Sequence, residues 1–148
     1  MTLETDIACL RELPLFRELP ASRLKLVALM GERLRFPAGD TIVSDQERLQ
    51  GVYVVLQGDV EFSQRRDDGG GRRFQKEAGS IIGDVSLLSG KQFLGKVSAG
   101  TEVLALRIPK DLFFELLQTV PEFSLAVSRD LADRVARLAN ALLAGEAA

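Results

Sequence analysis

Histidine and tryptophan are absent from this chain of 148 residues, and cysteine occurs only once. Without histidine the chain cannot build a Ser-His-Asp or Cys-His catalytic arrangement, and it cannot bind a metal through imidazole. Because Cys9 is alone, an intramolecular disulfide and an iron–sulfur cluster held by several thiolates are both excluded. We therefore expect that the chain is not an enzyme and holds no metal.

Long apolar runs and a concentration of positive charge are also missing. No apolar segment approaches the roughly 20 residues that a membrane span needs, and Met1–Leu10 carries two acids where a signal peptide would be apolar. The net charge is −2, and basic residues are interspersed with acidic ones rather than gathered in a stripe. These features predict a cytoplasmic protein that binds neither nucleic acid nor membrane.

Periodicity divides the chain into three parts. Residues 1–31 have helical spacing interrupted by Pro14 and Pro20, which break helices. Residues 32–108 contain many short runs of alternating or β-branched residues with glycines between them, a pattern typical of a compact barrel or roll. Residues 109–145 return to helical spacing. We expect a single domain over 1–148, mainly β with flanking helices.

Two proline positions and one glycine-rich segment refine this outline. Pro109 fits the first position of a helix over Asp111–Thr119, and Pro121 opens another segment. A long helix is expected from about Leu125 to Leu143. Asp67–Gly71 carries three consecutive glycines, but no Gly-Lys-Ser/Thr follows, so it predicts a hairpin tip rather than a phosphate loop.

The stretch Ile82–Val97 is the first candidate for a binding site. Gly83 permits a sharp turn with close approach of a ligand to the backbone. Asp84–Leu88 can form one helical turn whose amides face an anion, and Asp84 could accept a hydrogen bond from a sugar hydroxyl. The alternative is a tight turn between two strands with Asp84 as a helix N-cap.

Three stretches together resemble the cyclic-nucleotide-binding domain of the catabolite-activator-like regulators, and the opening Leu13–Leu19 is also similar to that family's start. The stretches are Phe36–Ile42 (FPAGDTI), Val52–Val60 (VYVVLQGDV) and Ile82–Leu88 (IGDVSLL). The resemblance runs from about Leu10 to Leu142. It implies a β-roll of the double-stranded β-helix, jelly-roll type, with N-terminal helices and a long C-terminal helix that covers the ligand. It also implies cyclic AMP or cyclic GMP as the ligand.

The family's phosphate cassette resembles Gly-Glu-apolar-x-Leu-Leu followed by Pro-Arg-Ala/Ser-Ala-Thr. There the acid binds the ribose hydroxyl and the arginine pairs with the cyclic phosphate. Gly83, Val85, Leu87 and Leu88 match the first half, Ser86 takes its small position, and Asp84 replaces the glutamate. The second half departs, since Gln92, Phe93 and Lys96 replace the proline, arginine and threonine.

The loss of the arginine weakens the expectation of cyclic-nucleotide binding. A charge-assisted hydrogen bond from arginine to phosphate contributes roughly 1.5–3 kcal/mol, and phenylalanine supplies none of it. Lys91 or Lys96 could supply charge, but lysine does not reproduce the fork of arginine. Three interpretations stay open: a different small ligand, weak binding of cyclic nucleotide, or an empty pocket kept as a scaffold.

The candidate site residues follow from these motifs. The ligand-binding set comprises Gly83, Asp84, Val85, Ser86, Phe93, Leu94, Gly95 and Lys96. A second set recurs at spacings of four, three and four on the long helix and predicts a dimer seam: Leu131, Val135, Leu138 and Leu142. The seam could also pack on the roll.

The resulting hypothesis is a ligand-sensing regulatory module with weak or non-standard nucleotide binding. Ligand binding would reposition the long helix and act on a protein partner. The alternative is a ligand-free interaction and dimerisation module with the same fold. We expect a homodimer and no DNA-binding domain after the long helix. An enzyme of cupin-like architecture is disfavoured because no histidine is available for its metal.

Overall fold

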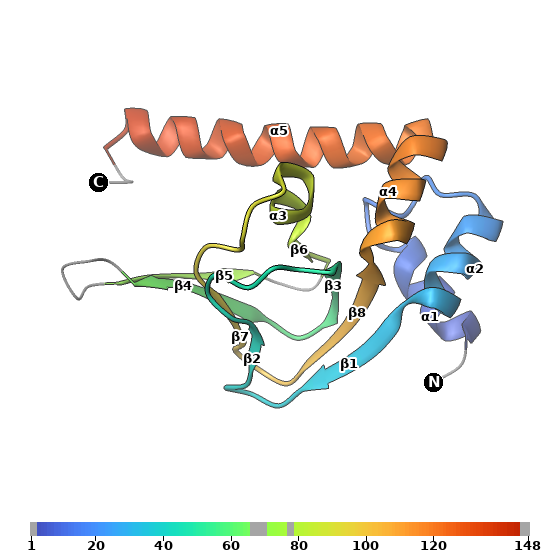
Figure 1. The fold of residues 1–148 in the computed structure, drawn as a ribbon, viewed down its shortest axis with the longest axis horizontal. Helices are drawn as coiled ribbons and strands as arrows, with labels where there is room; N and C mark the ends of the chain where they lie inside the picture. Colours follow the sequence, from blue (N-terminus) through green and yellow to red (C-terminus); the bar gives the residue numbers. More distant parts are fainter. Residues whose placement is uncertain (1–2, 66–70, 77–78, 146–148) are drawn as a thin grey trace.

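The computed structural model describes residues 3–65, 71–76 and 79–145, and its strands form a β-roll of two antiparallel sheets (Figure 1). In the order of their pairing, the first sheet contains β1 (Glu32–Phe36), β8 (Val103–Pro109), β3 (Gly51–Gln57) and β6 (Ile81–Ile82). The second contains β2 (Thr41–Val43), β7 (Lys96–Ala99), β4 (Val60–Arg65) and β5 (Gly71–Lys76). The expected fold class is confirmed.

Helices flank the roll at both ends of the sequence, as predicted. They are α1 (Leu3–Arg11), α2 (Ala21–Met30), α3 (Asp84–Ser89), α4 (Lys110–Thr119) and α5 (Pro121–Leu143). Figure 1 shows α5 lying lengthwise above the roll, with α3 directly beneath its middle. The short α3 is inserted between β6 and β7, so the predicted cassette lies between the roll and the long helix.

Two predicted boundaries were wrong, both next to a proline. Pro109 is the last residue of β8 and caps α4, since its extended ψ of 144° precedes the first helical residue. The long helix begins at Pro121 rather than Leu125, because a proline without an N–H is tolerated in the first helical turn. The predicted hairpin joins β4 to β5, but the glycine-rich tip itself lies outside the described residues, at 66–70.

The first half of α5 is anchored in the core. Phe123 is fully buried, and its ring lies 5.6 Å from that of Phe16 and 6.2 Å from that of Phe113. Val127 is buried one turn later. From Val135 onward the large apolar side chains are exposed. The helix therefore has a fixed N-terminal half and a C-terminal half with little support from the roll.

Across the described part of the chain, none of the helices combines the length and the apolar character that crossing a bilayer requires.

Candidate functional site

Asp84 lies at the centre of the site, at the start of α3. The preceding Gly83 has a φ of +97°, which glycine adopts readily and other residues do not. A Cβ at position 83 would lie 2.5 Å from Leu49 Cδ1, so this glycine also lets the loop before β3 pack against the turn. As a result, α3 begins deep in the structure and the Asp84 side chain is almost completely buried, with 2% of it exposed.

The partner of Asp84 is Arg134, which reaches it from α5. The guanidinium Nη2 donates to Asp84 Oδ2, and Nη1 lies 3.4 Å from Oδ1. The same Nη2 lies 2.9 Å from Oδ2 of Asp130, one turn earlier on α5. A buried carboxylate is stable only when it is paired, and Arg134 provides that pairing. This ion pair joins the cassette to the long helix.

Arg134 remains charged in this position. Burial lowers the pKa of its guanidinium, but the hydrogen bond and the negative charge of Asp84, together with Asp130, outweigh burial and raise the pKa above its ordinary value. The Nε atom is buried and has no hydrogen-bond partner among the described residues. An unsatisfied buried donor costs about 1–3 kcal/mol, so an acceptor atom that reached Nε would be bound favourably.

The second half of the cassette is bound to the loop between β2 and β3, residues 44–50. The Gln46 amide donates to the Phe93 carbonyl at 2.7 Å, and the Phe93 amide donates to the Glu47 carbonyl at 2.9 Å. Asp45 Oδ1 accepts a hydrogen bond of 2.8 Å from the Gly95 amide. Because Leu49 of this loop also packs against Gly83, the loop contacts both halves of the cassette.

The remaining predicted ligand-binding residues differ in exposure. Ser86 is buried beside Asp84 on α3, whereas Val85 is 54% exposed. Phe93 is half-buried and packs against the core, Leu94 is 74% exposed, and Lys96 is exposed at the start of β7. Residues 93–96, which stand where the family has its arginine and the residues after it, therefore present apolar surface and an exposed lysine.

The predicted seam residues lie along α5 on one side of the helix. Leu131 is half-buried and packs against the core. Val135, Leu138 and Leu142 are 63%, 63% and 67% exposed. Among the described residues, nothing covers these three side chains, so they do not belong to the core of the roll.

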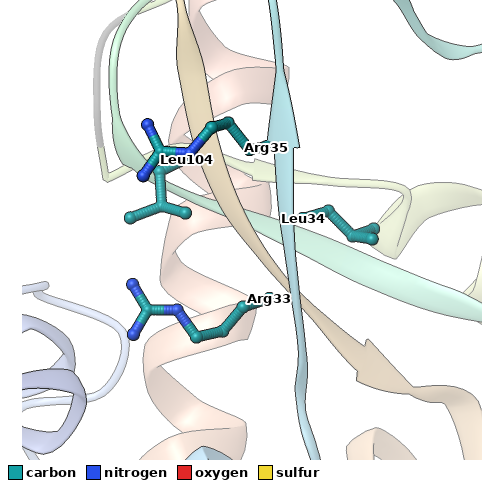
Figure 2. Close-up of a pocket in the computed structure, with 4 residues that line it drawn as sticks. All are labelled: Arg33, Leu34, Arg35 and Leu104. Carbon is teal, nitrogen blue, oxygen red and sulfur yellow. The ribbon is translucent and has the colours of Figure 1, made fainter. Parts of the chain in front are cut away.

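An open hollow of about 270 Å³ lies elsewhere, on the first sheet (Figure 2). Arg33 and Arg35 point to the same side of β1 beside Leu104, while Leu34 points away. Arg33 is paired with the buried Asp6, and Arg35 is paired with Glu102. Since both guanidinium groups already have carboxylate partners, we interpret this hollow as structural.

Sequence reasoning missed Arg134, although the sequence contains a signal for it. Arg134 lies seven residues after Val127 and eleven after Phe123, so all three share one face of the helix. Arginine is almost never buried without a partner. An arginine on an apolar helix face therefore requires a carboxylate opposite it, and Asp84 is the one already singled out.

The chain matches the family model described as "Cyclic nucleotide-binding domain" over residues 33–120. A cAMP-dependent protein kinase regulatory subunit from Aspergillus fumigatus is 28% identical over 116 residues, which cover 78% of this chain and 27% of that protein. The chain spans between 7% and 28% of the length of the curated relatives it matches.

Solved structures share the fold. The catabolite activator protein of Thermus thermophilus has a TM-score of 0.76 at 24% identity, with 88% of this chain and 63% of that one covered. The regulatory subunit of a cAMP-independent protein kinase A from Trypanosoma cruzi, bound to guanosine, has a TM-score of 0.77 at 24% identity, with 97% and 51% covered. At these identities the likeness is one of fold.

Proposed function

Because the chain belongs to the cyclic nucleotide-binding domain family, we propose that it is a non-enzymatic ligand-sensing module with weak or non-standard binding of cyclic nucleotides. Its ligand site lies where α3, the loop 44–50 and α5 meet. Asp84 is the acceptor for a ribose hydroxyl, and binding there changes the contact between the cassette and α5.

The ion pair between Asp84 and Arg134 is the observation that carries this proposal. Asp84 belongs to the cassette, and Arg134 belongs to the helix that would carry a signal. A ligand that bonds to Asp84 must share the carboxylate with Arg134 or displace it. In either case the contact between Asp84 and α5 differs between the free and the bound protein. A sensor needs such a difference, because a ligand shifts a conformational equilibrium only through contacts that differ between the two states.

The pair retains capacity for a ribose. An ionised carboxylate has about four acceptor positions, and Arg134 and the Val85 amide are its protein partners. A ribose hydroxyl can donate to a remaining position. A hydroxyl, which can donate, therefore suits Asp84 better than a group that only accepts.

Phe93 supports the proposal that cyclic nucleotides bind weakly. It stands at the cassette position where the family has an arginine for the phosphate, and its half-buried ring offers no hydrogen bond. The guanosine-bound relative from Trypanosoma cruzi supports the idea that this fold accepts a nucleoside without a phosphate.

The experiment is isothermal titration of the protein and its Asp84→Asn variant with guanosine, adenosine, cyclic GMP and cyclic AMP. A hydrogen bond to a charged group contributes about 1.5–3 kcal/mol, so the variant should bind whichever ligand the protein binds about 10- to 100-fold more weakly. Asp133→Asn is the matched control, because Asp133 is an exposed carboxylate of α5 that pairs with the exposed Arg137.

The control variant should bind like the unmodified protein. If Asp84→Asn binds every ligand as tightly as the unmodified protein does, the site is not at Asp84 and the proposal is wrong. Failure of the unmodified protein to bind any of the four compounds at millimolar concentration would also contradict it.

A second function, self-association through α5, is favoured by the exposure of Val135, Leu138 and Leu142. Together with Leu131 they form a stripe with the spacing of a coiled-coil seam. We propose that a second copy of the chain covers this stripe. The stripe borders the face that carries Arg134, since Leu131 and Leu138 lie three and four residues from it.

A further inference from the structure

We propose that Asp130 is a positioning residue that holds Arg134 to one oxygen of Asp84 and so keeps the other oxygen available to a ligand hydroxyl. This inference rests on the proposed function, because it concerns the carboxylate that would bind the ligand. Asp130 belongs to α5 and lies outside both the cassette and the predicted seam.

The contact between Arg134 and Asp84 is uneven. Nη2 of the guanidinium donates to Oδ2 of the carboxylate, whereas Nη1 lies 3.4 Å from Oδ1. Charge-assisted hydrogen bonds from arginine to a carboxylate measure about 2.7–2.9 Å, and the two groups often form two such bonds in parallel. The second bond is stretched here, so Arg134 occupies Oδ1 only weakly.

Asp130 accounts for this unevenness. Its Oδ2 lies 2.9 Å from the same Nη2 that bonds to Asp84. A guanidinium is planar and rigid, and each terminal nitrogen carries two hydrogens, so Nη2 can serve both carboxylates. The Asp130 side chain is 39% exposed, against 2% for Asp84, so Asp130 draws the guanidinium toward solvent. Nη1 is thereby turned away from Oδ1.

Oδ1 of Asp84 is the oxygen that this arrangement leaves for a ligand. It accepts a hydrogen bond of 3.0 Å from the Val85 amide, which uses one of its two acceptor positions. The other position suits a hydroxyl, whose hydrogen bond to a carboxylate is short, about 2.5–2.7 Å, and strong. Because the Asp84 side chain is almost completely buried, a ligand gains Oδ1 only if Nη1 does not occupy that position.

Asp133 provides a matched control on the same helix. It too pairs with an arginine four residues later, Arg137, but the two side chains are 57% and 73% exposed. Alanine at position 130 or 133 removes one ion pair of this spacing and changes helix propensity by the same amount. Only Asp130→Ala should therefore affect the contact between Arg134 and Asp84.

The first measurement is the coupling between Asp84 and Arg134, taken from a double-mutant cycle of Asp84→Asn and Arg134→Ala by denaturant unfolding. Without Asp130 the guanidinium can form both bonds to Asp84, so in the Asp130→Ala background the coupling, as an equilibrium constant, should rise at least about fivefold. In the Asp133→Ala background it should stay within about twofold. If Asp130 only stabilised α5, its removal would lower the coupling instead.

The second measurement is isothermal titration of the same variants, and of Asp130→Glu, with guanosine, adenosine, cyclic GMP and cyclic AMP. With Nη1 on Oδ1, Asp130→Ala should bind the ligand at least about fivefold more weakly than the unmodified protein does. Asp130→Glu keeps a carboxylate four residues before Arg134, so it should restore the affinity to within about twofold. Asp133→Ala should bind like the unmodified protein.

A stronger coupling together with a weaker ligand affinity is the combination that a merely structural role of Asp130 would not produce. A coupling that is unchanged or lowered in Asp130→Ala would overturn the inference. If a ligand binds and depends on Asp84, but Asp130→Ala binds it as tightly as the unmodified protein does, the sensing site stands and the role of Asp130 is wrong. If the unmodified protein binds none of the four compounds, both are wrong.

Discussion

Replacing Arg134 with alanine should lower the free energy of unfolding by about 3 kcal/mol, although the side chain belongs to a helix whose second half is exposed. Removing one partner of a buried ion pair typically costs about 3–5 kcal/mol, because the other charge remains buried without compensation. The Arg134 side chain is 23% exposed, so some water reaches it and the lower end applies. Denaturant unfolding followed by circular dichroism measures the change.

Arg137→Ala is the control for this prediction. Arg137 pairs with Asp133 four residues earlier, but their side chains are 73% and 57% exposed. Such surface pairs contribute about 0.3–0.5 kcal/mol, so this variant should unfold almost like the unmodified protein. If Arg134→Ala and Arg137→Ala lowered the free energy of unfolding equally, the ion pair with Asp84 would not be what stabilises α5 against the cassette.

A double-mutant cycle assigns the loss to this pair. When Asp84→Asn is combined with Arg134→Ala, no charge is left buried, so the combined cost should be smaller than the sum of the single costs by about 1–3 kcal/mol. Strict additivity would indicate that Arg134 acts through Asp130 or through packing of its aliphatic stem.

The second large effect is expected on self-association. Val135→Lys together with Leu138→Lys should weaken dimerisation by at least roughly 100-fold, since burying each such apolar side chain contributes about 1.5–3 kcal/mol and lysine adds like charges across the seam. Both positions are 63% exposed within one copy, so the fold of each copy should be unaffected. Sedimentation velocity over a range of concentrations measures the change.

The control changes a similar side chain on another surface. Leu29 of α2 is 61% exposed, and Leu29→Lys should leave the association unchanged. Leu131 is unsuitable for the test because it also packs against the core. A monomeric unmodified protein at all concentrations would contradict the seam, and so would a lysine variant that dimerises normally.

The sequence predicted the roll and the short helical turn that begins at Asp84, because both depend on local signals. Gly83 was identified as a turn residue, and its φ of +97° agrees. The exposure of Val135 and Leu138 could not be read from spacing alone, because a heptad-like stripe is the same whether it covers a roll or a second copy. Only the placement of α5 over α3 shows that Val135 and Leu138 do not pack on the roll.

Contacts between segments far apart in the chain were the part that sequence reasoning missed. Arg134 lies 50 residues from Asp84, and Gly95 lies 50 residues from Asp45. Neither pair has a spacing that links its members, and each residue alone is an ordinary charged residue or glycine. Folding creates the site by bringing a loop and a helix to a cassette whose own residues are only partly those of its family.

The most direct measurement is isothermal titration of the unmodified protein with guanosine and cyclic GMP, and with adenosine and cyclic AMP. Each pair shares a base and a ribose and differs at the phosphate. The account predicts that, for at least one base, the nucleoside binds at least as tightly as its cyclic nucleotide, because Asp84 accepts the ribose while Phe93 offers nothing to the phosphate. Tighter binding of both cyclic GMP and cyclic AMP than of the corresponding nucleosides would contradict it.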